Sequence, residues 1–190
     1  MRVSREQADK NREQIIETAG RLFREHGIGG IGVADLMKAA GLTHGGFYGH
    51  FSSKEDLADQ ACGRIMARSA SKWTALGEAH GPDRAVAEIV RYYLSPAHRD
   101  APGRGCAIAA LASDAARQKG RVRLTFEKGV QALVAIMAGY LPGSAEARRR
   151  KALANLSTLV GALILARSVD DRTLSDDLLS AAAESLTPAG

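Results

Sequence analysis

The spacing of apolar residues near the start of the chain constrains its fold more than any other feature. In "NREQIIETAGRLFREHG", residues 11–27, apolar side chains recur at i, i+1, i+4, i+7 and i+8, one face of a helix with 3.6 residues per turn. These residues are Ile15, Ile16, Ala19, Leu22 and Phe23. Gly27 follows them, and glycine commonly ends a helix. The segment is predicted to be an amphipathic helix that stops at Gly27, and "SREQ", residues 4–7, has capping-box spacing that allows an earlier start.

Composition extends the helical prediction to the whole chain. Of the 190 residues, 45% are hydrophobic and only five are proline, and long alternating runs of Val, Ile, Thr and aromatic residues are missing. Alternating runs of that kind form strands, whereas alanine-rich segments favour helices. We therefore expect an all-α fold, with an N-terminal three-helix unit and a C-terminal helical bundle.

Several functional classes lack the residues that they need. Cys62 and Cys106 fit neither a disulfide framework nor a zinc site, and no metal-ligand spacing, cofactor motif or coherent catalytic Ser, His and Asp set is visible. The first residues are polar, and the longest apolar-leaning run, residues 153–166, is about 14 residues, which is too short to span a bilayer. We expect a cytoplasmic protein with no metal, cofactor or membrane partner, and not an enzyme.

The net charge of +5 favours nucleic-acid binding, but its distribution limits that interpretation. Residues 1–60 carry 8 Lys and Arg against 9 Asp and Glu, so the excess of positive charge lies in the rest of the chain. If the N-terminal part binds DNA, a few well-placed side chains must do so rather than bulk charge.

Three helices are predicted close together in this N-terminal part. A short helix over residues 33–40 follows the amphipathic one, and Gly41 ends it. The next helix spans only about residues 43–49, with Thr43 at its start. A long helix then restarts near "SSKED", where Ser52 with Glu55 and Ser53 with Asp56 are two candidate capping pairs, and it runs to about Gly77. Two helices joined by a tight glycine turn make a helix-turn-helix unit.

Residues 12–57 closely resemble the DNA-binding domain of the tetracycline-repressor-like (TetR) family of bacterial transcription regulators. The resemblance rests on "IIETAGRLFREHG", "VADLMKAAGL" and "GFYGHFSSKEDL" in register. It implies a helix-turn-helix DNA-binding domain over residues 1–56 and a helical effector-binding and dimerisation domain over residues 57–190. It also implies a DNA-binding regulator, most often a repressor, that a small-molecule effector releases from a pseudo-palindromic double-stranded DNA operator.

The resemblance assigns the DNA contacts to the short third helix and the turn after it. The matching positions are Thr43, His44, Gly45, Gly46, Tyr48, His50 and Lys54. Phe47 and Phe51 are expected to hold this helix on the core. Packing alone is an alternative role for Tyr48, and a structural hydrogen bond is one for His50.

The chain departs from the family pattern where several DNA-facing side chains are common. Gly32 replaces a capping threonine, Ala34 a longer polar residue, Gly46 a base-contacting side chain and Gly49 an aromatic residue. Direct base contacts would then rest chiefly on Thr43 and His44, with glycines that let the backbone approach DNA closely.

In the C-terminal part, bulky residues of the middle helices are candidate effector contacts: Met66, Trp73, Tyr92, Tyr93, Phe126 and Met137. A stripe along residues 148–169 is expected to form a homodimer with leucines of the last helix, and packing within its own domain explains the stripe equally well. The stripe comprises Leu153, Leu156, Val160, Leu163, Ile164 and Arg167.

Cys106 suggests an alternative regulator. It lies at the expected start of a helix beside Arg104, a setting that lowers the pKa of a thiol. Some family members sense oxidants or electrophiles through such a cysteine, so a thiol-based sensor acting through Cys106 is the alternative hypothesis. Plain packing at a helix start explains the residue as well.

Overall fold

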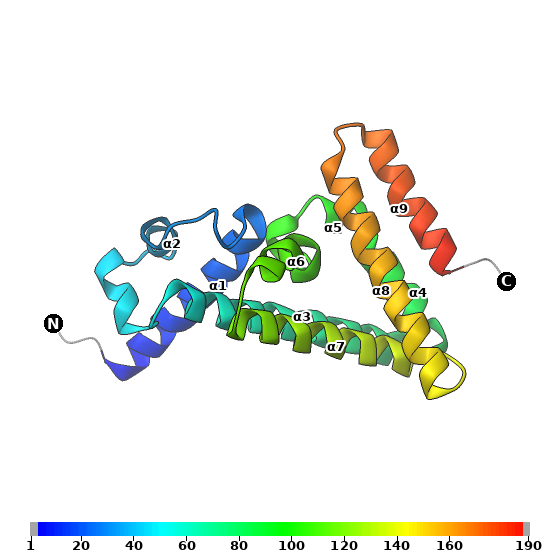
Figure 1. Ribbon diagram of the computed structural model, residues 1–190, viewed down its shortest axis with the longest axis horizontal. Helices are drawn as coiled ribbons and strands as arrows, with labels where there is room; N and C mark the ends of the chain where they lie inside the picture. The colour runs from blue at the N-terminus through cyan, green and yellow to red at the C-terminus, as the bar shows by residue number, and fades with distance from the viewer. Residues whose placement is uncertain (1–3, 188–190) are drawn as a thin grey trace.

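The computed structural model describes residues 4–187, and these residues form helices and connecting turns without a strand (Figure 1). The all-α prediction is confirmed. The α-helices and 3₁₀ helices (η) are α1 Arg5–His26, α2 Val33–Ala39, η1 His44–Gly49, α3 Lys54–His80, α4 Pro82–Tyr93, α5 Pro96–Arg99, η2 Pro102–Arg104, α6 Ala107–Arg117, α7 Arg121–Gly139, α8 Ala145–Ser168 and α9 Arg172–Leu186. None of the described helices is long and apolar enough to cross a membrane.

Helix α1 has the ends and the buried face that its sequence predicts. The Ser4 hydroxyl accepts a hydrogen bond from the Gln7 N–H at 3.2 Å, so the helix takes the earlier of the two possible starts. Gly27 ends it with φ of 78°, a left-handed conformation that costs glycine little. The apolar face, from Ile15 to Phe23, is buried.

Helix α2 and the short helix η1 form the helix-turn-helix with a tight turn at Gly41, where φ is 69°. The Leu42 N–H donates to the Met37 carbonyl at 2.9 Å, and the Gln14 side chain donates to the Ala40 carbonyl at 2.8 Å, so the freed ends of α2 have partners. The short helix predicted over about residues 43–49 forms as a 3₁₀ helix over residues 44–49. Three of these six residues are glycine, which lacks the propensity to sustain a longer α-helix.

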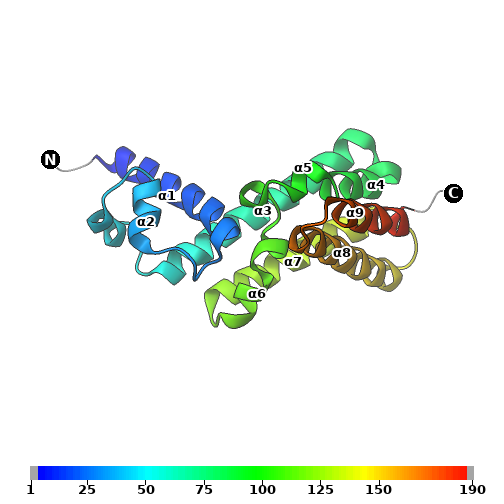
Figure 2. The same cartoon turned by 90° about the horizontal axis from the view of Figure 1, so that it is seen from above.

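Helix α3 is the longest element and joins the two ends of the molecule (Figures 1 and 2). Ser53 caps it by accepting from the Asp56 N–H at 3.1 Å, which selects the second of the two candidate capping pairs. The helix continues beyond the expected end at Gly77 to His80. Gly77 serves instead as a contact point, because an added Cβ would lie 2.1 Å from the Tyr140 hydroxyl. The proposed boundary at residues 56 and 57 falls in the first turn of this helix.

The second half of the molecule packs against the far part of α3. Helix α7 lies along α3, and α4, α8 and α9 gather at the end remote from α1 and α2 (Figures 1 and 2). Residues 95–105 contain the short helices α5 and η2, because Ser95 caps α5 and prolines occupy the first positions of both helices. Helix η2 rests on α1, so this segment connects the two halves of the molecule.

Candidate nucleic-acid interface and central cavity

The short helix η1 presents an exposed polar surface. Thr43 and His44 at its start are exposed, and Tyr48 is 68% exposed. His50 and Lys54 are half-buried. Most of the Tyr48 side chain is therefore accessible to solvent.

Two phenylalanines fix η1 to the core, as the sequence predicts. Phe47 and Phe51 are fully buried, and their ring centroids lie 5.6 Å apart. The ring of Tyr48 meets Phe47 edge-on at 5.2 Å, and the Arg12 guanidinium lies 5.2 Å from the Phe51 ring centroid. Burial of these rings stabilises a helix whose own propensity is poor, so the exposed residues have a fixed platform.

Lys54 begins α3 beside two carboxylates. Backbone hydrogen bonding within Glu55 and a hydrogen bond from Ser53 hold the pKa of the Glu55 carboxyl below its usual value. Hydrogen bonds from the Ser52 backbone and then the Gln60 side chain lower the pKa of Asp56. Since these acids already satisfy the positive end of α3, an anion approaching here would meet the Lys54 ammonium rather than free N–H groups.

Three positions of η1 lack a side chain because they are glycine, although the fold has room for a larger residue at each. Gly45 and Gly49 have no positive φ, and a Cβ added to either would meet nothing within 4 Å. At Gly46 an added Cβ would make only ordinary contacts with Met37 and Thr43 at 3.7 Å. Gly32, at the start of α2, makes no side-chain cap.

No group of three or more metal-ligating side chains occurs in the part of the chain described.

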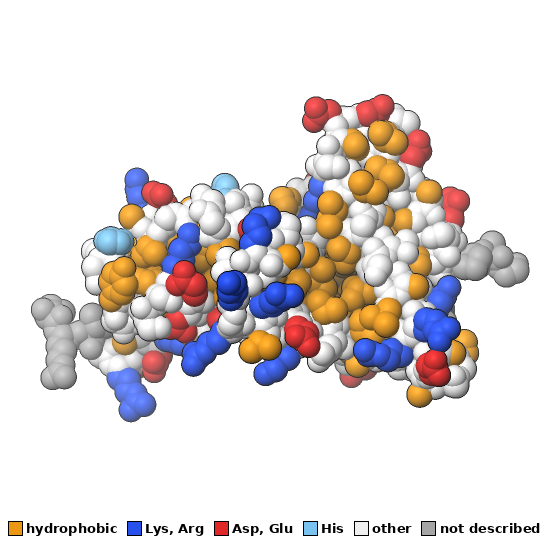
Figure 3. All heavy atoms as spheres, viewed as in Figure 1, with side chains coloured by type: hydrophobic (Ala, Val, Ile, Leu, Met, Phe, Trp, Pro, Cys, Tyr) orange, Lys and Arg blue, Asp and Glu red, His pale blue; other side chains and the backbone are white. Residues whose placement is uncertain are grey.

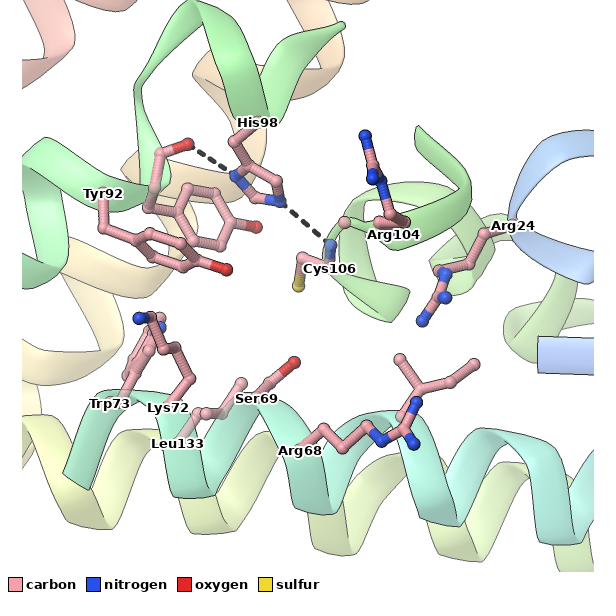
Figure 4. Close-up of a pocket in the computed structure, with 13 residues that line it drawn as sticks. Arg24, Arg68, Ser69, Lys72, Trp73, Tyr92, His98, Arg104, Cys106 and Leu133 are labelled. Atoms are coloured by element: carbon pink, nitrogen blue, oxygen red, sulfur yellow. Dashed lines mark hydrogen bonds between the residues drawn. The ribbon is translucent and has the colours of Figure 1, made fainter. Parts of the chain in front are cut away.

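A cavity of about 270 Å³ lies in the middle of the molecule, between α1, α3, α4, α6, α7 and the α5–η2 segment (Figure 4). Three of the candidate effector contacts, Trp73, Tyr92 and Tyr93, line it. The other three, Met66, Phe126 and Met137, are buried in the core and do not line this cavity.

His98 and Cys106 form a hydrogen-bonded wall of the cavity. The Cys106 N–H donates to His98 Nε2 at 3.0 Å, so the neutral ring carries its proton on Nδ1, which donates to the Tyr93 carbonyl at 2.7 Å (Figure 4). Burial lowers the pKa of His98, which keeps this arrangement neutral. Cys106 is the N-cap residue of α6 and is only 4% exposed. The other cysteine, Cys62, does not line the cavity, and burial raises the pKa of its thiol to about 12.

Basic side chains surround the same cavity, and none of them is among the effector contacts predicted from the sequence. Arg24 comes from α1, Arg68 and Lys72 from α3, and Arg104 from η2. Arg24 donates to the Gly103 carbonyl through Nε at 2.9 Å and also through Nη2, which ties α1 to η2. The spacing of Arg68 and Lys72, four residues apart, could have indicated a shared helical face; Arg24 and Arg104 join them only through the tertiary fold.

The outer surface of α8 and α9 carries exposed apolar side chains (Figure 3). Leu153, Ile164 and Leu165 on α8 are 42, 41 and 52% exposed, and Leu174 on α9 is 47% exposed. Other members of the expected stripe, Leu156 and Leu163, are buried in their own domain. The stripe therefore divides between the core and the surface.

Comparisons with known proteins agree with this architecture. Residues 15–61 match the family model of bacterial regulatory proteins of the tetR family. The transcriptional regulator AcrR of Shigella flexneri is 38% identical over 56 residues, which are 30% of this chain and 26% of AcrR. Over these residues the chain matches the TetR family. The alignment with AcrR spans about a quarter of that relative.

Two further proteins resemble the chain over more of its length. The transcriptional repressor NemR of Escherichia coli is 27% identical over 141 residues, which are 71% of this chain and 69% of NemR. The crystal structure of its reduced form superposes with a TM-score of 0.78 at 22% identity, covering 94% of this chain and 95% of NemR. AibR, solved with isovaleryl coenzyme A and operator DNA, superposes with a TM-score of 0.63 at 16% identity over 95% of this chain and all of AibR. These structural likenesses show the fold.

Proposed function

We propose that this TetR-family protein is a DNA-binding transcriptional regulator, a homodimeric repressor that a small-molecule effector releases from its operator. The observation that carries the proposal is η1 itself. It presents Thr43, His44 and an exposed Tyr48 on a platform fixed by buried Phe47 and Phe51, in the segment that matches the family model. The names of AcrR and NemR as regulators support a role in regulation rather than catalysis.

The polar residues of η1 divide into base and phosphate contacts. Thr43 and His44 begin the helix, where residues of a recognition helix reach base edges in the major groove. Gly45 and Gly46 let the backbone come close to DNA. Tyr48, His50 and Lys54 are suited to phosphate oxygens, which position a protein on the duplex without reading sequence. Residues 1–56 would thus supply DNA binding, and residues 57–190 the effector site and the dimer.

The effector would act through the contact between α1 and the cavity wall. Arg24 both lines the cavity and donates to Gly103, and Asp114 of α6 accepts from the Ile28 N–H at 3.2 Å. A molecule in the cavity that moves Arg24 or η2 therefore displaces the DNA-binding module relative to α6. AibR, solved with both a thioester ligand and operator DNA, supports a ligand-responsive mechanism of this kind.

Selection of bound DNA from a random pool tests the DNA-binding role. We expect a short pseudo-palindrome, and Lys54→Ala should weaken binding to it evenly across sequences and reduce its salt dependence. Tyr48→Phe should lose about 3- to 10-fold in affinity, since it removes one hydroxyl that folding does not use. The matched control is Tyr140→Phe, at the other end of the molecule. Unchanged affinity in both test variants contradicts the assignment.

A thiol-based sensor acting through Cys106 is the second candidate function. Cys106 lines the cavity and its N–H is held by His98, so a change at the sulfur would lie directly beside the proposed effector site. NemR, whose fold this chain shares, was solved in a form described as reduced, which supports considering a redox role here. If this candidate is correct, Cys106→Ser abolishes DNA release by an electrophile such as N-ethylmaleimide, while Cys62→Ser leaves it intact. Release that survives Cys106→Ser rules out this sensor.

A further inference from the structure

The central cavity is electrostatically one-sided. Four cationic side chains line it, and no Asp or Glu is among the described residues that do so. Arg68, Lys72 and Arg104 are exposed and stand around its opening, whereas Arg24 is half-buried (Figure 4). Figure 4 shows the side chains of Arg24, Arg68 and Arg104 on one side of the cavity and the Tyr92 ring on the other, together with Lys72, whose Nζ lies 5.2 Å from the Tyr92 ring centroid.

These cations are incompletely neutralised by the protein. Arg68 pairs with Glu17 at 2.6 Å, and Glu17 also lies near Arg64. Within residues 4–187, Arg24, Lys72 and Arg104 have no ion pair with a carboxylate. Burial, and then repulsion by Arg68, lowers the pKa of Arg24, which still stays charged at neutral pH. The cavity therefore holds a surplus of positive potential beside a half-buried guanidinium.

The opposite wall is aromatic. Trp73 and Tyr93 are almost fully buried and meet edge-on, with ring centroids 6.2 Å apart. Tyr92 stacks on the His98 ring at 5.7 Å. The Tyr93 hydroxyl is buried and has no hydrogen-bond partner among the described residues, which is costly for a polar group. This wall suits a flat apolar body that carries a polar atom.

We propose that the cavity binds an organic anion whose flat apolar body packs against Trp73 and Tyr93 and whose acidic group faces Arg68 and Arg104, while Lys72 adds positive charge beside the aromatic wall. A volume of about 270 Å³ accommodates a body of one or two rings. Carboxylate, sulfonate and phosphate groups share the chemistry that these cations recognise. The inference deepens the proposed function, since it names the chemical class of the effector.

A matched pair of fluorescent probes tests the charge preference. 1-Anilinonaphthalene-8-sulfonate and N-phenyl-1-naphthylamine share one ring system, and only the first carries an anionic group. Trp73 is the one tryptophan in the sequence and lines the cavity, so energy transfer from it reports occupancy of this site rather than of the surface at large. We expect the sulfonate to bind at least about 10-fold more tightly than the neutral probe, with a gap that narrows as salt increases.

Two variants with the same change in net charge locate the preference. Arg68→Gln with Lys72→Gln removes two cations from the opening of the cavity and should bring the ratio of the two affinities to within about 2- to 3-fold. Arg64→Gln with Lys128→Gln removes one cation from α3 and one exposed cation from α7, neither of which lines the cavity, and should keep the wild-type ratio. Circular dichroism melts confirm that both double variants fold.

Three results would overturn the proposal: equal affinity of the two probes in the wild type, a ratio unchanged by the Arg68 and Lys72 substitutions, or an equal loss in the control. DNA binding is measured separately with the selected operator. If the protein binds the anionic probe selectively but binds no operator DNA, the cavity assignment is supported and the proposed regulatory function is contradicted. Operator binding together with equal probe affinities sinks the anion proposal and leaves the regulator standing.

Discussion

At the scale of single residues, the glycines of η1 show how the fold and the proposed function make different demands. Gly41 adopts a left-handed conformation that the turn requires, so its identity follows from the backbone. Gly45 and Gly49 adopt no such conformation and have open space where a side chain would stand. Packing inside the protein therefore does not require glycine at these two positions. Glycine there is expected if DNA approaches the backbone of η1 closely.

Gly49→Ala should separate these demands. Alanine in a helical turn stabilises the protein by about 0.5–1 kcal/mol relative to glycine, which raises the melting temperature of a chain of this length by about 1–4 °C. The added methyl group would hold the backbone away from DNA, and we expect affinity for the selected operator to fall about 10-fold, roughly the loss of one groove contact. Thermal melts and fluorescence anisotropy measure the two effects.

Gly139→Ala is the matched control for that substitution. Gly139 ends α7 at an exposed position where an added Cβ also meets nothing within 4 Å. It should raise stability similarly and leave DNA affinity unchanged. If Gly49→Ala keeps full DNA affinity, the backbone of η1 does not approach DNA closely and the glycines need another explanation.

At the scale of elements, the sequence predicts helices wherever local chemistry defines them. Ser4, Gly27, Ser53 and Gly41 set ends that the structure reproduces, because capping and left-handed turns depend on neighbouring residues only. The end of α3 is a different case. Gly77 has the composition of a terminator, but Tyr140 packs against it from a distant part of the chain, so the helix continues.

The central cavity was only partly predictable for the same reason. Its aromatic residues could be named because bulky side chains on middle helices are general candidates for a pocket. Its cations come from three separate elements, α1, α3 and η2, which only the tertiary fold brings together. Periodicity indicates which face of one helix is apolar, but it does not state which faces of different helices meet.

At the scale of the whole molecule, the exposed apolar surface of α8 and α9 has no partner among residues 4–187. Leu153 and Ile164 lie 11 residues apart, three helical turns, so they share one face of α8, and Leu165 adjoins it. Half-buried Val160 lies between them on the same face, and Leu174 extends the apolar surface onto α9. A contiguous apolar surface of this kind marks an interaction site, and a two-fold axis would pair it with itself.

Leu165→Glu should therefore shift the protein toward the monomer. A two-fold interface contains the substitution twice, and each copy would bury an unpaired carboxylate, so we expect the dimer dissociation constant to rise by at least about 100-fold. Sedimentation equilibrium measures that constant directly. Loss of the dimer should in turn weaken binding to a pseudo-palindrome more than binding to a single half-site, because two linked modules bind with a high effective concentration.

Leu124→Glu gives the comparison that isolates the interface. Leu124 is 56% exposed on α7, close to the 52% of Leu165 on α8, so both substitutions place a charge at an equally open leucine. Only Leu165→Glu should change the sedimentation behaviour. Equal dissociation constants in the two variants would exclude Leu165 from the dimer interface. In that case the two DNA-binding modules would have to be brought together through another surface, and the exposed leucines of α8 and α9 would await a different partner.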